Sequence, residues 1–144
     1  MRVQSHFKAV DLLAIQPPAA HETRQTPTLW LIEVKDYRSH RRTKEIPLDQ
    51  EVAEKAICTL AGLLPAALRA TNSNEQKYAQ KAIRCKELRV ILHLEPPARG
   101  SSLFTPKLER TTIQDSLRRK IRALDPHPKV VDRASTLSLP WTVC

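Results

Sequence analysis

Apolar runs alternate with polar stretches along this chain in a pattern that predicts an α/β fold. Runs with the composition of β-strands occupy residues 7–15, 28–37 and 87–95, and a shorter one follows at 129–133. The run at 28–37 (TLWLIEVKDY) is the clearest, because bulky and β-branched side chains dominate its first half. In 87–95, alternate residues place four apolar side chains on one face: Leu88, Val90, Leu92 and Leu94.

Two other stretches have the apolar spacing of amphipathic helices. The first follows Pro47-Leu48-Asp49, where Asp49 is the expected N-cap, and Pro65 is expected to end this helix or to kink it before it continues to Arg69. Its apolar stripe consists of Val52, Ala56, Ile57, Leu60, Leu63 and Leu64. The second helix covers 107–124, with a stripe formed by Ile113, Leu117, Ile121 and Leu124. The polar, basic stretch 72–86 has room for another short helix.

The expected order of elements is β-β-α-β-α-β within a single domain of residues 1–144, which is long enough for a hydrophobic core. Prolines and polar residues make 16–27 a loop. If the strands on either side of this loop are neighbours, they form an antiparallel hairpin with a long connection. The sequence thus predicts an α/β sheet protein.

Composition narrows the classes of function. The chain has 24 Lys and Arg against 15 Asp and Glu, a net charge of +9, which suits a polyanionic partner such as nucleic acid. With two glycines, it contains no P-loop, no GxGxxG dinucleotide fingerprint and no GxSxG nucleophile elbow. Its histidines lack HExxH spacing, and there is no CxxC.

Cysteine usage and hydropathy predict a cytoplasmic protein. The cysteines are odd in number and widely spaced, as expected for free thiols in a reducing compartment: Cys58, Cys85 and Cys144. No apolar run approaches the roughly 20 residues needed to span a bilayer. The N-terminal residues do not have the pattern of a signal peptide, so no membrane partner is expected.

The tripeptide Glu33-Val34-Lys35, which follows the apolar run of residues 29–32, is the strongest indication of chemistry. A carboxylate and a lysine two residues apart on a strand project from the same face. Burying both is costly unless the charges meet a partner, a metal or a substrate. Asp11 adds a second carboxylate on the preceding predicted strand.

Two carboxylates of this kind suit phosphodiester hydrolysis, which needs charge neutralisation and an activated water. A divalent cation such as Mg²⁺ or Mn²⁺ supplies both. Asp11 and Glu33 would be its ligands, and the backbone carbonyl of Val34 could complete the set. Lys35 would orient or deprotonate the attacking water and support the phosphate charge. The alternative is a strand end that reaches solvent, with Glu33 and Lys35 in an exposed cross-strand pair.

Asp11 followed by Glu33-x-Lys35 resembles the PD-(D/E)xK nuclease superfamily, the restriction-endonuclease-like fold, over residues 7–37. This resemblance implies a mixed central sheet flanked by helices, metal binding at Asp11 and Glu33, and a catalytic role for Lys35. Val10 stands where the family motif has proline, and ten residues precede Asp11. The first helix and strand of the family have little room there, so the expected core has a shortened N-terminal part.

The residues after the tripeptide would hold nucleic acid. Tyr37 shares the strand face of Glu33 and Lys35 and could stack on a base or cap the sheet edge. The basic loop that follows could grip the phosphate backbone or be an ordinary solvated loop; its cations are Arg38, Arg41, Arg42 and Lys44. His40 is more simply an incidental loop histidine, and His93 a hydrogen-bonded structural one.

The sequence therefore predicts a metal-dependent endonuclease acting on DNA. One alternative is a non-catalytic nucleic-acid-binding or assembly module with a degenerate nuclease fold. Another is a small interaction protein whose basic face binds an acidic protein. A homodimer would give a small nuclease domain a second active site for the other strand.

Overall fold

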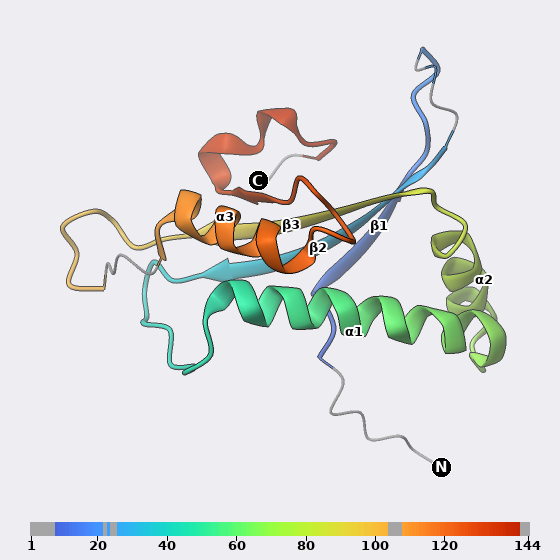
Figure 1. The fold of residues 1–144 in the computed structure, drawn as a ribbon, viewed down its shortest axis with the longest axis horizontal. Coiled ribbons are helices and arrows are strands. Elements are labelled where there is room, and N and C mark those ends of the chain that lie inside the picture. Colours follow the sequence, from blue (N-terminus) through green and yellow to red (C-terminus); the bar gives the residue numbers. More distant parts are fainter. Residues whose placement is uncertain (1–7, 22, 24–25, 104–107, 142–144) are drawn as a thin grey trace.

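Four strands and three helices form an α/β structure in the computed structural model, which describes residues 8–21, 23, 26–103 and 108–141 (Figure 1). Predicted residues outside these ranges, including Phe7, Lys107 and Cys144, are not described. The elements in chain order are β1 (Leu12–Gln16), β2 (Thr28–Asp36), α1 (Leu48–Arg69), α2 (Ser73–Ala82), β3 (Glu87–Glu95), α3 (Arg110–Ile121), β4 (Lys129–Val131) and the 3₁₀ segment η2 (Arg133–Ser138).

The sheet is mixed, with the strand order β1-β2-β3-β4. β1 runs antiparallel to β2, so the predicted hairpin is confirmed, and Leu12 pairs with Ile32. β3 and β4 each run parallel to their neighbour, and Glu33 of β2 lies beside Leu92 of β3. The parallel step between β2 and β3 requires a long crossover, which α1 and α2 supply.

The alternation of side chains divides the sheet into two unlike faces. The helices cover the face that carries Leu31 and Leu92, which pack with residues of α1, α2 and α3 in the main core. Ile32 and Ile91 point to the other face, where the partly buried Trp141 and Leu139 of the C-terminal segment pack against them. Glu33 and Lys35 follow Leu31 on the helix face. The sheet therefore directs the predicted site towards α1.

Trp30 is half-buried on the second face. Its ring meets Trp141 edge-on, with 5.2 Å between centroids, and its Nε1 donates to Gln16 Oε1 at 2.9 Å. His93 projects from this face too and contacts Glu95 Oε1 through Nε2 at 2.9 Å, so it is a hydrogen-bonded structural histidine on the side of the sheet away from Glu33.

Two expectations about local structure were wrong. Asp11 precedes β1 instead of lying on it, because its carboxylate accepts the Val34 amide and the Val10 amide bonds to Thr59, so strand pairing stops at Leu12. Asp49 is not an N-cap, since α1 begins at Leu48 and the Asp49 carboxylate is used by α3 instead.

The helices differ from their predicted bounds in understandable ways. Of the two alternatives at Pro65, continuation to Arg69 is the one observed in α1. The basic stretch after α1 forms α2. The structure thus has one helix more than the simple β-β-α-β-α-β order. α3 ends at Ile121, ahead of Leu124, and β4 is shorter than 129–133. Within the described ranges, no helix is long and apolar enough to cross a membrane.

Candidate active site

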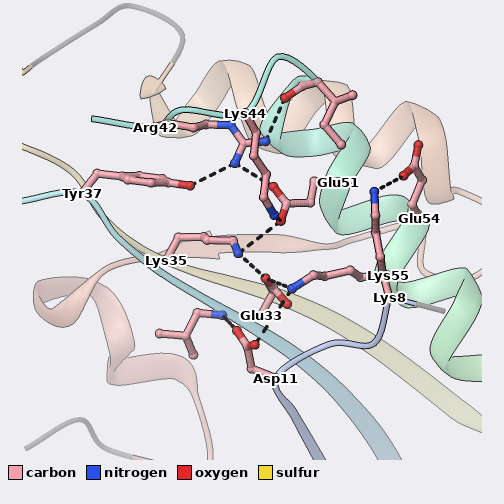
Figure 2. A network of polar contacts seen from close by, with 12 residues as sticks. Lys8, Asp11, Glu33, Lys35, Tyr37, Arg42, Lys44, Glu51, Glu54 and Lys55 are labelled. Carbon is pink, nitrogen blue, oxygen red and sulfur yellow. Dashed lines mark hydrogen bonds and ion pairs between the residues drawn. The ribbon is translucent and has the colours of Figure 1, made fainter. Parts of the chain in front are cut away.

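Glu33 is fully buried at the end of β2 that faces α1, with 0% of its surface exposed. This burial excludes the alternative of an exposed cross-strand pair. Glu33 Oε1 lies 2.7 Å from Lys35 Nζ and 2.6 Å from Lys55 Nζ (Figure 2). The other oxygen, Oε2, is buried and makes no hydrogen bond within the described part of the chain. A buried carboxylate oxygen without a donor is costly, so this oxygen suits an incoming cation.

Helix α1 contributes two charged residues that the sequence did not single out. Glu51 and Lys55 are four residues apart, so they share one helix face, and both reach the predicted site. Glu51 is fully buried, and its Oε1 lies 3.3 Å from Lys35 Nζ. A second row of residues at helical spacing lies beside the apolar stripe of α1: Leu48, Glu51, Lys55 and Thr59. This row was the sequence signal that could have identified Glu51 and Lys55 as site residues.

The basic loop between β2 and α1 completes the surroundings of Glu51. Arg42 Nη1 lies 2.6 Å from Glu51 Oε2, and Lys44 contacts Oε1. Arg42 also donates to the hydroxyl of Tyr37 at 3.0 Å and to the Ile46 carbonyl at 2.8 Å. The loop is therefore tied to the site through the Glu51 carboxylate.

Neighbouring opposite charges shift the pKa values of Glu51 and Lys35 in this network. Burial raises the pKa of Glu51, but hydrogen bonds from Lys44 and Arg42 and the charge of Lys35 outweigh it and lower the pKa to about 2. Burial lowers the pKa of Lys35, but its contacts with Glu33 and Glu51 outweigh burial and hold the pKa above its ordinary value. Lys35 is thus a cation at neutral pH, which favours an orienting role over a deprotonating one.

Asp11 lies at the more open end of the site, with 44% of its side chain exposed. Its Oδ2 accepts the Val34 amide at 2.8 Å, and its Oδ1 is 4.0 Å from Lys55 Nζ. The amide and carbonyl of one strand residue point to the same edge, so the Val34 carbonyl also faces the Asp11 side. Lys55 therefore lies between the carboxylates of Asp11 and Glu33. With Lys35 also on Glu33, the three residues predicted from the sequence, Asp11, Glu33 and Lys35, lie in one site.

The donor set for a metal ion is small. Among the described residues, no group of three or more His, Cys, Asp and Glu side chains could hold a metal. The predicted set contains two carboxylates, Asp11 and Glu33, with the Val34 carbonyl as a backbone donor. The unpartnered Glu33 Oε2 and the orientation of the Val34 peptide fit a hard cation that keeps several waters, as Mg²⁺ does.

The residues predicted to hold nucleic acid have different environments. Tyr37 is buried, with 6% exposure, so its ring belongs to the core and is not displayed for stacking on a base. Arg38 is exposed and forms a two-point pair with Asp36, whose pKa falls to about 2 because Arg38 hydrogen-bonds to it. Arg41 is exposed and donates to the Ser102 carbonyl at 2.6 Å, and half of the Lys44 side chain is exposed.

An open pocket of about 240 Å³ lies between the end of β2 and the loop that follows it. Its walls include Lys35, which contacts the buried carboxylates, and the exposed His40, Arg41 and Lys44 at the mouth. Four of its nine lining residues are Lys or Arg and one is Asp, so the pocket is suited to an anionic group such as a phosphate.

Comparisons with known proteins give one partial likeness. No family model and no solved structure matches the chain. A cysteine–tRNA ligase from Neisseria meningitidis serogroup A is 33% identical over 103 residues, which cover 66% of this chain and 13% of that protein. The chain therefore spans about an eighth of the length of this curated relative.

Proposed function

We propose that this protein is a metal-dependent endonuclease of the PD-(D/E)xK type that cleaves phosphodiester bonds in DNA. The observation that carries the proposal is the fully buried Glu33, which has one unpartnered oxygen and shares a strand face with Lys35, beside Asp11. Burying such a charged pair costs more free energy than burying apolar residues at the same positions, so the stability of the sheet does not explain it.

The arrangement of elements supports the same family. The resemblance implies a mixed central sheet flanked by helices, with a helix between the strands that carry the motif and the next strand. Here β1 and β2 form an antiparallel pair, and α1 with α2 leads to β3.

Each residue has a definite task in this proposal. Asp11, Glu33 and the Val34 carbonyl would hold Mg²⁺ or Mn²⁺, which activates water and neutralises charge on the phosphate when bound. Lys35 would orient the attacking water and stabilise the phosphate charge from the same strand face. Glu51 holds Lys35 from the opposite side, at 3.3 Å, and so acts as a positioning residue.

Cations around the mouth of the site would hold the DNA backbone. Arg41 and Lys44 are exposed there and would position DNA through its phosphates and contribute affinity. Arg38 is paired with Asp36 and lines a separate pocket with Ile32 and His93, residues of the other sheet face. The overall charge of +9 adds long-range attraction.

Cleavage of a mixed substrate panel tests the proposal. Duplex, single-stranded and branched DNA and RNA are incubated with Mg²⁺, Mn²⁺ or EDTA. Cleavage of DNA that requires the metal is the expected result. A substrate preference for RNA would retain the nuclease and change its substrate class, while the absence of cleavage on every substrate would contradict the proposal.

A second candidate is a nucleic-acid-binding module with a degenerate site. It is favoured by the small donor set and by the lysine that stands between the two carboxylates. Such a protein would bind DNA with a steep salt dependence and without cleavage, and Glu33→Gln would leave the affinity unchanged.

A further inference from the structure

Lys55 brings an ammonium group to the two carboxylates that would bind a metal. Its Nζ lies 2.6 Å from Glu33 Oε1 and 4.0 Å from Asp11 Oδ1, and Figure 2 shows it joined to both. The other lysine on Glu33, Lys35, instead bridges towards Glu51. Lys55 is therefore the cation placed between Asp11 and Glu33.

The position of Lys55 is fixed by the helix that carries it. Only 13% of its side chain is exposed, and the neighbouring Val52 and Ala56 are fully buried in the main core. One turn later, Thr59 accepts the Val10 amide at 3.0 Å and donates to the Lys55 carbonyl at 2.7 Å. This bond attaches α1 to the segment that carries Asp11, so Lys55 and Asp11 are held in register.

We propose that Lys55 is a built-in cation that competes with a divalent metal for Asp11 and Glu33. The inference rests on the proposed function, since it concerns the same site. Two cations held by the same pair of carboxylates repel each other, and the site already has Lys35, Arg42 and Lys44 around its acidic groups. Asp11 and Glu33 would hold a metal ion more tightly once the ammonium of Lys55 had left them.

The competition has a measurable consequence for metal affinity without any substrate. Mn²⁺ binding is measured by isothermal titration calorimetry on the wild-type protein, Lys55→Met and Lys55→Gln. Removing the ammonium should tighten the dissociation constant at least tenfold. Lys8→Met is the matched control, because Lys8 is an exposed lysine paired with Glu54 outside the donor set, and it should leave the constant within about twofold of wild type.

The outcomes separate this inference from the proposed function. If the wild type binds Mn²⁺ and neither Lys55 variant binds it more tightly, the competition is overturned and the nuclease proposal stands. If no Mn²⁺ binds to the wild type or to the variants, both proposals fail. Circular dichroism of each variant establishes that it is folded before its affinity is interpreted.

A second measurement uses the wild type alone and does not depend on the stability of the variants. Lysine acylation by an N-hydroxysuccinimide ester is followed residue by residue by mass spectrometry, with and without saturating Mn²⁺. A displaced Lys55 should react several times faster with Mn²⁺, while Lys8 keeps its rate. An unchanged or slower rate at Lys55 would overturn the competition.

Discussion

Glu51 shows how one buried carboxylate organises the site at the residue scale. It receives Lys35, Arg42 and Lys44 from two different segments, and its side chain has no exposed surface. Buried ion pairs often add little to stability compared with apolar packing, but removing one partner leaves the others uncompensated. Glu51 is therefore a residue whose loss should affect both the stability and the geometry of the site.

Glu51 should make the stability of this protein depend on pH in the acid range. Its folded-state pKa of about 2 lies below the ordinary value of 4.5, so the unfolded state binds the proton more readily as the pH falls. The stabilisation is complete above pH 4.5 and is lost as the pH falls towards 2. Urea unfolding should show that Glu51→Gln is less stable than wild type at neutral pH, and that the difference shrinks across this window.

The exposed Glu45 offers a charge-matched control in the same segment. Glu45→Gln should change the free energy of unfolding by less than about 0.5 kcal/mol at any pH. A difference between Glu51→Gln and wild type that is constant from neutral to acid pH would contradict the assignment of Glu51 as an ionised, paired carboxylate.

At the scale of elements, α1 joins the site to the rest of the core. Its buried stripe packs on the sheet, and Asp49 in its first turn binds α3 through Ser116 Oγ at 2.7 Å and Lys120 Nζ at 2.8 Å. These contacts hold the N-terminal half of α1, which carries Glu51 and Lys55, at a fixed position against β2.

Asp49→Ala should loosen this connection. The Asp49 carboxylate, with 11% of its side chain exposed, would no longer accept its contacts from Ser116 and Lys120, and this loss should lower the free energy of unfolding by about 1–3 kcal/mol. Asp115→Ala, at an exposed position on α3, should cost less than about 0.5 kcal/mol. Equal effects of the two substitutions in chemical denaturation would show that the α1–α3 link carries no special stability.

The strands and their faces were predictable from the sequence, whereas the helix contribution to the site was not. Alternating apolar residues gave β3 with its correct bounds and faces, and the run at 28–37 gave β2 to within one residue. Glu51 and Lys55 could not be assigned, because a helical pattern shows which residues share a face and not which strand that face meets. The predictions for Asp49 as an N-cap and for Asp11 on a strand were wrong for a related reason. Their carboxylates bind partners far away in the sequence, and these contacts override the local preference for a cap or a strand.

At the scale of the whole molecule, the excess of positive charge should govern association with DNA. Each phosphate contact releases counterions, so the binding constant falls with salt with a log–log slope of about −0.9 per contact. The exposed Arg41 lies at the mouth of the pocket, on the loop between β2 and α1. Arg84, also exposed, comes two residues after the end of α2, and Figure 1 shows α2 at the opposite end of the molecule from the loop between β2 and α1.

Arg41→Ala should weaken binding to all DNA sequences alike and reduce the salt slope by about one unit. Arg84→Ala should leave both the slope and the affinity nearly unchanged. Fluorescence anisotropy with labelled duplexes over a range of salt concentrations measures both quantities. Equal losses for the two variants would indicate diffuse attraction over the whole surface and would argue against a binding face at the pocket.

Metal-dependent cleavage in strand-motif variants tests the central claim most directly. The chain contains a second Glu-x-Lys, Glu75-Gln76-Lys77, on the exposed surface of α2, and it provides the matched control. With Mg²⁺ or Mn²⁺ and the best DNA substrate, Lys35→Met and Glu33→Gln should lower the cleavage rate at least roughly hundredfold, and Lys77→Met and Glu75→Gln should leave it unchanged. Failure of the wild type to cleave, or equal cleavage by Lys35→Met and wild type, would contradict the account.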